Sequence, residues 1–231
     1  MPIPSMPEHF ADWNEEMVAR HDPELFHHHP RGVVRWIEGR RMRAVLALLQ
    51  ARPEHRVLEV GCGAGNVLTR TPAAARYAID LSRRMVGRAR NVLGPAATIA
   101  LADAERLPFR DREFERVICS SVLAHVLHPE RVLEEAYRVL APGGRLVVSV
   151  SHEAAIERGI ALAQRLGLNR LLLGNSGAPS EASVYSSEYH LHHFDIGLLR
   201  ETAARLPRER ALKKIPLPFY PIHLVAAYVK E

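Results

Sequence analysis

The sequence predicts an α/β fold built around a mostly parallel sheet. One observation is a short apolar run, residues 56–60, that ends in three alternate glycines, Gly61, Gly63 and Gly65, and continues into a helical pattern. Another is the alternation of strand-like and helix-like segments from Arg56 onward, which indicates βαβ units. A strand, a glycine-rich turn and a helix can form a cradle for a nucleotide-like ligand, because the turn permits close approach and the helix presents free N–H groups.

The composition is that of an ordinary globular protein. The 231 residues are 47% hydrophobic and 25% charged, which suffices to bury a full core in one domain. No apolar run approaches the roughly 20 residues that span a bilayer. The first ten residues lack the pattern of a signal peptide, so a cytoplasmic location is expected. The two cysteines, Cys62 and Cys119, are too few for a disulfide framework or a cysteine-based zinc site.

The net charge of +5 permits contact with nucleic acid or anionic lipid. The arginines, however, are scattered singly over helical stretches, without a block of like charge. This distribution favours a solvated basic surface, and a nucleic-acid partner is not expected.

Strand patterns and helix patterns alternate along the chain. The expected strands are Arg56–Val60, Arg76–Ile79, Thr98–Leu101, Arg116–Ser120, Gly144–Ser149 and Leu224–Val229. The expected helices are Val33–Gln50, a segment capped by Ser82 that carries Met85, Val86 and Val92, Glu130–Leu140, Ala154–Leu173 and Asp195–Leu206. Pro129 opens the helix Glu130–Leu140, and Pro142-Gly143-Gly144 is expected to end it.

The chain divides into four segments of one domain. Residues 1–53 hold a lead segment rich in histidine and aromatics, which is not expected to be a core element, and the first helix. Residues 54–151 form the strand–helix core, and residues 152–194 form an insertion that leaves from the ligand edge of the sheet. Residues 195–231 supply a C-terminal helix and two closing strands, whose prolines suit edge positions.

Acidic residues close three successive strands beside the glycine turn: Glu59, Asp80 and Asp103. Singly, Asp80 suits a turn, Asp103 suits a helix N-cap, and Glu59 suits a hydrogen bond to the loop. Turn and cap chemistry does not explain all three at one edge of the sheet, so together they favour a ligand site.

Five ordered motifs carry a resemblance to a known family: residues 57–66, Asp80, and residues 103–109, 114–126 and 138–144. With these motifs the chain resembles the class I S-adenosylmethionine-dependent methyltransferases, and most closely the small-molecule branch that includes ubiquinone and menaquinone biosynthesis methyltransferases. The resemblance covers residues 55–151 in register. It implies a Rossmann-like fold with a seven-stranded sheet, helices on both faces and a cap insertion. It also implies S-adenosyl-L-methionine as cofactor and a small-molecule or lipid-like methyl acceptor.

The resemblance implies a partner for each part of the cofactor. Glu59 would hold the ammonium of the amino-acid end, and the two oxygens of Asp80 would accept the ribose hydroxyls. The other implied cofactor-binding residues are Gly61, Gly63 and Gly65 beside the ribose and methionine portions, Leu81 and Met85 on the adenine, Asp103 and Ala104 at its edge, and Ser120 and Ser121 under the departing methyl group.

Methyl transfer from a sulfonium is an in-line displacement, so the protein must mainly position the acceptor and exclude water. A base is needed only if the acceptor holds its proton. The candidates are His125 after the fourth strand, His152 after the fifth, and Tyr189, within a Tyr/His-rich stretch that also carries Tyr185, His190, His192 and His193. The same stretch, residues 185–194, and the N-terminal residues 13–29 are expected to close the acceptor pocket, because they hold the unassigned aromatics and histidines.

Other functions stay open. A nicotinamide dinucleotide suits an acidic residue about 20 positions after the glycines, but the third glycine here follows the second by two residues rather than three, and Glu59 would repel a pyrophosphate. Modification of RNA or protein is another alternative, as is a non-catalytic protein that keeps the cradle. The histidine clusters at residues 27–29 and 190–193 suit a metal, but no carboxylate motif accompanies them, so no metal is predicted.

Overall fold

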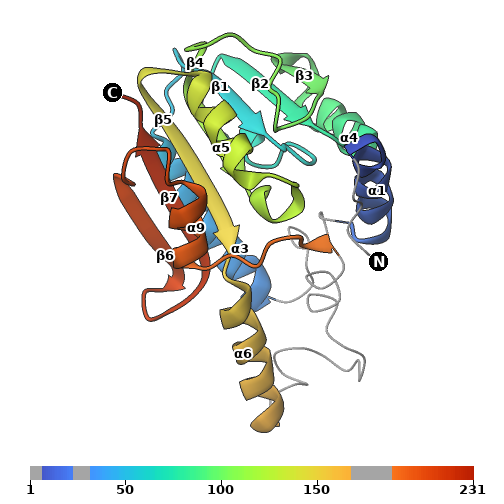
Figure 1. Ribbon diagram of the computed structural model, residues 1–231, viewed down its shortest axis with the longest axis vertical. Helices are drawn as coiled ribbons and strands as arrows, with labels where there is room; N and C mark the ends of the chain where they lie inside the picture. Colours follow the sequence, from blue (N-terminus) through green and yellow to red (C-terminus); the bar gives the residue numbers. More distant parts are fainter. Residues whose placement is uncertain (1–6, 23–31, 168–188) are drawn as a thin grey trace.

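The computed structural model describes residues 7–22, 32–167 and 189–231. Its strands form one seven-stranded sheet in the order β3-β2-β1-β4-β5-β7-β6. The first five strands pair in parallel, and β7 runs antiparallel to both of its neighbours. The predicted α/β class with a mostly parallel sheet is confirmed (Figure 1).

Each expected strand lies inside an observed one. The strands are β1 (Arg56–Val60), β2 (Ala75–Asp80), β3 (Ala97–Leu101), β4 (Phe114–Ser120), β5 (Leu140–Ser151), β6 (Ala211–Leu217) and β7 (Tyr220–Val229). Because β1 to β5 are parallel, their carboxyl ends meet at one edge of the sheet, where α/β proteins bind ligands.

Helices cover both faces of the sheet. They are α1 (Pro7–Arg20), α3 (Gly32–Leu49), α4 (Arg83–Leu93), α5 (Pro129–Arg138), α6 (Glu153–Arg165) and α9 (Ile196–Thr202). Side chains of α3 and α4 share one core cluster with the sheet, and those of α5 and α9 share the other. Figure 1 shows α5 and α9 in front of the sheet, α3 behind it, and α6 projecting from the end of β5.

The start of α4 was predicted from Ser82, and that prediction is confirmed. The Ser82 hydroxyl accepts a hydrogen bond from the Met85 N–H at 3.2 Å, as an N-cap does. The helix thus begins three residues after Asp80, the last residue of β2.

The prediction that the N-terminal segment is not a core element is wrong. Residues 7–20 form α1, whose side chains Phe10, Trp13, Met17 and Val18 are buried against Met85 of α4. The four residues lie at positions i, i+3, i+7 and i+8, which share one face of a helix. The neighbouring prolines and charged residues obscured this stripe.

Polar contacts fasten α1 to α4. Both carboxylate oxygens of Asp22 accept from the Arg88 guanidinium, at 2.7 and 2.8 Å. Glu15 Oε1 accepts the backbone N–H of Arg84 at 3.2 Å. Since Arg84 lies in the first turn of α4, α1 is held close to the carboxyl end of β2.

Helices α5 and α6 end earlier in the structure than the sequence predicts. The helix after Pro129 ends at Arg138, and β5 already begins at Leu140, so Pro142-Gly143-Gly144 lies inside the strand. This early part of β5 pairs with the residue that follows β7, because Gly143 N donates to Lys230 O at 2.7 Å and Lys230 N donates to Gly144 O at 3.1 Å. Helix α6 ends at Arg165, and residues 168–173 of the expected helix lie outside the described residues.

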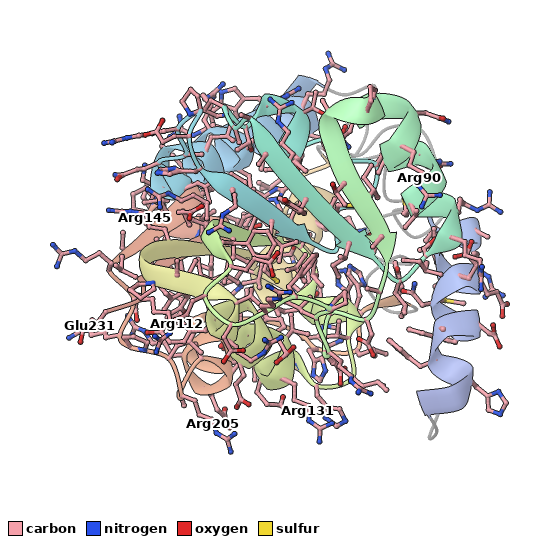
Figure 2. All side chains as sticks on the ribbon, turned by 90° about the horizontal axis from the view of Figure 1, so that it is seen from above. Arg90, Arg112, Arg131, Arg145, Arg205 and Glu231 are labelled. Carbon is pink, nitrogen blue, oxygen red and sulfur yellow. The ribbon has the colours of Figure 1, made fainter. Side chains whose placement is uncertain are left out.

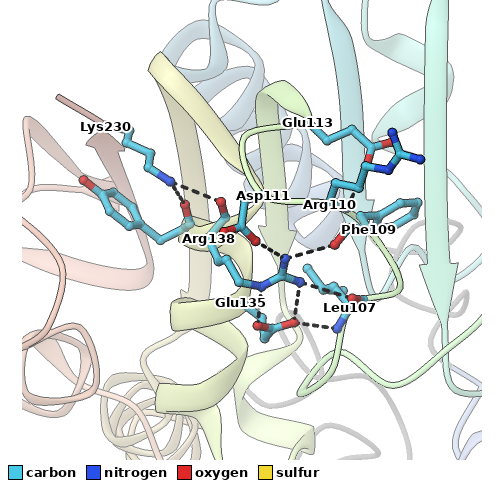
Figure 3. Close-up of polar contacts among 9 residues, drawn as sticks. Leu107, Phe109, Arg110, Asp111, Glu113, Glu135, Arg138 and Lys230 are labelled. Carbon is cyan, nitrogen blue, oxygen red and sulfur yellow. Dashed lines mark hydrogen bonds and ion pairs between the residues drawn. The ribbon is translucent and has the colours of Figure 1, made fainter.

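A network around Arg138 fixes the loop that follows β3 (Figure 3). The guanidinium donates to the carbonyl oxygens of Phe109 and Leu107 at 2.9 and 3.2 Å and to the carboxylates of Glu135 and Asp111. Hydrogen bonding between Arg138 and Glu135 raises the pKa of the arginine and lowers that of the glutamate. The part of this loop that leads into β4 is therefore anchored to α5.

The basic side chains are dispersed, as expected. Arg90, Arg112, Arg131, Arg145 and Arg205 lie at separate places around the molecule (Figure 2). Over residues 7–22, 32–167 and 189–231, none of the helices combines the length and apolar character that a membrane span requires.

Candidate functional site

The glycine turn after β1 has a left-handed backbone, with φ of +64° at Gly61 and +85° at Gly65. A Cβ atom on Gly61 would lie 2.4 Å from Cγ2 of Val122, and one on Gly65 would lie 2.8 Å from Cδ1 of Leu93. Both glycines are therefore required by contacts within the protein. Their implied contact with a cofactor stays a prediction.

Gly63 differs from its neighbours because it faces open space. Its φ is +52°, and a Cβ atom there would meet no other atom within 4 Å. Its N–H donates to Oδ2 of Asp80 at 2.9 Å, while Oδ1 of Asp80 accepts from Ser82 N at 2.9 Å. Each carboxylate oxygen keeps lone-pair capacity for one ligand hydroxyl. Burial raises the pKa of Asp80 to about 6, although the backbone N–H groups of Ser82, Gly63 and Leu81 lower it, so the group is mostly ionised at pH 7.

Glu59 is a buried carboxyl group beside the turn, with 2% of its surface exposed. Its Oε2 accepts the Leu68 N–H at 3.1 Å, which is the loop hydrogen bond considered for it from the sequence. Burial and the nearby Asp80 raise the pKa of Glu59 to about 8, although Leu68 N–H and the Arg41 guanidinium oppose this. A cationic ligand group that reached this carboxyl would stabilise its charged form.

The residues expected to pack on an adenine lie under α1. Met85 is 1% exposed, within the cluster formed by Phe10, Trp13 and Met17, and Leu81 packs against the same cluster. This part of the ligand edge therefore has an apolar wall built from α1 and α4.

Asp103 occupies a turn next to the end of β2. Its Oδ1 accepts the Glu105 N–H at 2.8 Å, and Ala104 between them is buried. The neighbouring Ala102 N donates to the carbonyl oxygen of Asp80 at 3.0 Å. Asp103 is thus part of a turn rather than the N-cap of a helix considered from the sequence, and it lies on the same edge as Asp80.

Ser120 and Ser121, at the end of β4, lie beside a buried arginine that the sequence analysis missed. Arg41 of α3 is 4% exposed, and its Nη1 donates to the hydroxyls of Ser120 at 2.7 Å, Ser149 at 3.2 Å and Ser121 at 3.3 Å. The spacing of Arg41 could have indicated its burial, since it lies four residues before Val45 and therefore on the apolar face of the helix.

Glu38 pairs with the other edge of this guanidinium. Its Oε2 accepts from Nε and Nη2 of Arg41 at 2.9 and 2.7 Å, and its Oε1 lies 3.1 Å from Nε2 of His223. Burial raises the pKa of Glu38, but Arg41 and His223 together hold it below its usual range. Glu38 therefore stays ionised and balances the buried charge of Arg41.

The rings of His125 and Tyr189 contact each other after β4 in a tilted arrangement, with centroids 4.1 Å apart. His125 Nδ1 lies 3.2 Å from the carbonyl oxygen of Tyr189, so Nδ1 carries the hydrogen and donates it to that oxygen. Burial, with a further contribution from His190, lowers the pKa of His125 well below its usual value. The Tyr189 hydroxyl donates to Asn14 Oδ1 at 3.0 Å.

His152 begins α6, where its Nδ1 accepts the Ala155 N–H at 3.2 Å. The next residue, Glu153, is buried and contacts the rings of His190 and His193. The histidine cluster thus has a carboxylate partner that the sequence pattern did not reveal. Within the described part of the chain, no group of three or more His, Cys, Asp or Glu side chains is arranged to hold a metal ion.

The described parts of the two expected lid segments contact each other. The ring centroids of Trp13 and Tyr189 lie 6.0 Å apart. Leu191 N donates to Ala124 O at 2.7 Å, which holds residues 189–191 on the loop after β4. The remainder of these segments, residues 23–29 with their histidines and residues 185–188 with Tyr185, lies outside the described residues.

Comparison with known proteins gives matches over the core of the chain. Residues 58–148 match the family model described as a methyltransferase domain. Malonyl-[acyl-carrier protein] O-methyltransferase of Geobacter sulfurreducens is 37% identical over 116 residues, which cover 47% of this chain and 43% of that protein. Demethylmenaquinone methyltransferase of Streptomyces griseus is 36% identical over 110 residues, which cover 46% of each. The chain therefore spans less than half of the length of these two relatives.

The whole chain resembles a solved structure in fold. A S-adenosylmethionine-dependent methyltransferase of Thermotoga maritima, described as a possible histamine N-methyltransferase, has a TM-score of 0.68 with this chain at 20% identity. The match covers 96% of this chain and all of the other. The likeness thus extends beyond the matched core to the terminal segments.

Proposed function

We propose that the chain transfers a methyl group from S-adenosylmethionine to a small-molecule or lipid-like acceptor, because residues 58–148 match the model of a methyltransferase domain. The observation that carries the proposal is the arrangement of Glu59, Asp80 and the open left-handed Gly63 at one edge of the sheet. The two relatives named for malonyl-[acyl-carrier protein] and demethylmenaquinone support this acceptor class.

The residues at this edge suit the cofactor, which would supply a methyl group on a positively charged sulfur. Glu59 would pair with its ammonium, because that pairing relieves the cost of ionising a buried carboxyl. Asp80 would accept ribose hydroxyls on the lone pairs left by Gly63 and Ser82. Leu81 and Met85 would pack on the adenine, with Asp103 and Ala104 at its edge.

On the acceptor side, Ser120 and Ser121 would line the floor where the methyl group is transferred. Of the three base candidates, His152 uses its Nδ1 to cap α6, and Tyr189 donates its hydroxyl to Asn14. His125 is the best placed, since burial keeps its imidazole neutral and it follows β4 in the same loop as Ser121. Helix α1 and residues 189–191 would exclude water from the site.

The proposal is tested by the substitution Gly63→Ala. We expect it to cost only about 1–2 kcal/mol of stability, because the backbone is left-handed but no atom obstructs the new methyl group. If the cofactor passes this glycine, the same methyl group should weaken binding of S-adenosylhomocysteine by about tenfold or more. Calorimetry and thermal unfolding measure the two effects.

The matched control is Gly87→Ala, because Gly87 lies in helix α4 and a Cβ atom there also meets no atom within 4 Å. This variant should bind S-adenosylhomocysteine like the parent protein and be equally or more stable. Unchanged affinity in a folded Gly63→Ala variant would contradict the placement of the cofactor. Absence of binding by the parent protein would contradict the proposed function itself.

Binding is also expected to release protons near pH 7. The raised pKa of Glu59 means that the folded protein holds a proton there from about pH 4.5 to about pH 8, whereas the unfolded chain does not. Glu59 therefore contributes stability below pH 4.5 that is lost as the pH rises to about 8. A ligand ammonium lowers this pKa and expels the proton.

The proton release can be measured by calorimetry with S-adenosylhomocysteine at pH 7 in phosphate and in Tris, which have different ionisation enthalpies. The binding enthalpies should differ between the buffers for the parent protein. The difference should shrink in Glu59→Gln, which has no proton to lose. Equal enthalpies in both buffers for the parent protein would exclude an ammonium at Glu59.

A further inference from the structure

The network around Arg41 is an unusual floor for a small-molecule site. It brings a buried guanidinium from α3 to the carboxyl ends of β4 and β5, where Ser120, Ser121 and Ser149 surround its Nη1. Arg41 is 4% exposed and Ser149 is 1% exposed, whereas Ser120 is half-buried and Ser121 is exposed. The network therefore runs from the protein interior to the edge where the acceptor would bind.

The directions of the hydrogen bonds in this network determine how many hydroxyl hydrogens the serines can donate to a ligand. Arginine has no acceptor, and its Nη1 carries two hydrogens, so the three serine oxygens share these two hydrogens and their own hydroxyl hydrogens point elsewhere. Ser120 and Ser149 are 2.9 Å apart, which uses one of the three hydroxyl hydrogens between them. Two hydroxyl hydrogens remain for donation, and Ser121 is the residue that can direct its hydrogen to the outside.

The backbone of Ser121 supports a ligand role. Its φ is +59°, in the left-handed region that a serine adopts only at a cost. This conformation places the hydroxyl on the same guanidinium as Ser120, and its N–H donates to Ser149 O at 2.8 Å. A strained residue at the ligand edge, held by two contacts to this network, is typical of a functional site.

We infer that Ser120 and Ser121, with Arg41 behind them, receive a negatively charged oxygen of the methyl acceptor. The acceptor would then be an acid, or a phenol or enol that ionises in the site. Glu38 balances the charge of Arg41, but it pairs with the Nε and Nη2 edge of the guanidinium, so the N–H groups of Nη1 still point to the serines and polarise their hydroxyls. Hydroxyl donors with a cation behind them stabilise an anionic oxygen more than a neutral one. This inference rests on the proposed function and names its substrate class.

The test uses matched pairs of a carboxylate and its amide as probes: acetate and acetamide, benzoate and benzamide, octanoate and octanamide. Each is titrated at pH 7.5 into the full chain saturated with S-adenosylhomocysteine. We expect at least one carboxylate to bind tenfold or more tightly than its amide. That preference should fall to about one in Ser121→Gly, which removes the hydroxyl and suits the left-handed backbone.

Arg41→Gln should lose the same preference, but it leaves Glu38 without its partner and can unfold the chain. The double variant Arg41→Gln/Glu38→Gln removes both charges and serves as the second arm. The matched control is Arg40→Gln, because Arg40 lies on the same helix and stacks on Trp36 instead. Arg40→Gln should keep the full preference.

The inference is overturned if every carboxylate binds no better than its amide, or if the preference survives in folded Ser121→Gly and in the double variant. Binding of S-adenosylhomocysteine is measured first in each protein. Its absence from the parent protein contradicts the proposed function, whereas its presence without a carboxylate preference contradicts only the acceptor class.

Discussion

Replacing Asp80 by alanine is expected to weaken binding of S-adenosylhomocysteine by about 2 kcal/mol or more, which is about 30-fold. The carboxylate would make charge-assisted hydrogen bonds to two ribose hydroxyls, and it also holds the N–H groups of Gly63 and Ser82. Its loss therefore removes ligand contacts and loosens the turn that approaches the ligand. Calorimetry gives the change in affinity, and thermal unfolding verifies that the variant is folded.

Two further variants make the Asp80 result specific. Asp80→Asn keeps the size and one oxygen, so it should lose less affinity than Asp80→Ala. Asp12→Ala removes an exposed aspartate from α1 and should leave the affinity unchanged. If folded Asp80→Ala binds as tightly as the parent protein, Asp80 is only a turn residue and the cradle assignment is wrong.

The largest loss of stability is expected for Gly61→Ala, at about 2–5 kcal/mol. A left-handed alanine costs about 1–2 kcal/mol, and insertion of a methyl group into a packed site costs about 1–3 kcal/mol. The new Cβ atom would lie 2.4 Å from Cγ2 of Val122, which is too close without movement of the loop after β4. Urea denaturation measures the free energy of unfolding.

The contact with Val122 can be separated from the backbone strain by a double-mutant cycle. Val122→Ala removes the obstructing methyl groups, so Gly61→Ala should cost about 1–2 kcal/mol less in that background. Equal costs in both backgrounds would show that the steric contact does not determine the need for glycine at this position.

The parts of the fold with strong local signals were predictable. Strand β1 has the predicted bounds, since an apolar run that stops at three glycines specifies both ends. The cap of α4 was predictable because Ser82 acts on a residue three positions away. The burial of α1 was not predictable. The apolar face of this helix packs against Met85, which lies far along the chain, and the prolines and charged residues around it obscured the apolar pattern.

The sequence predicts which residues lie at the site, but it does not predict the contacts that these residues make. Glu59, Asp80 and Asp103 do lie at one edge, because parallel strands end together. The sequence cannot show that Gly61 faces a valine while Gly63 faces open space, since both have the same local pattern. Arg41 was missed because an arginine on a basic helix resembles its exposed neighbours until the serines of two distant strands surround it.

The central claim is that this edge of the sheet binds the methyltransferase cofactor rather than a dinucleotide. A competition titration tests it most directly, with S-adenosylhomocysteine bound first and NADH added up to millimolar concentration. We expect micromolar affinity for S-adenosylhomocysteine and no displacement, because the buried carboxylate of Asp80 opposes a pyrophosphate. Displacement by micromolar NADH, or no binding of S-adenosylhomocysteine by the parent protein, would contradict the claim.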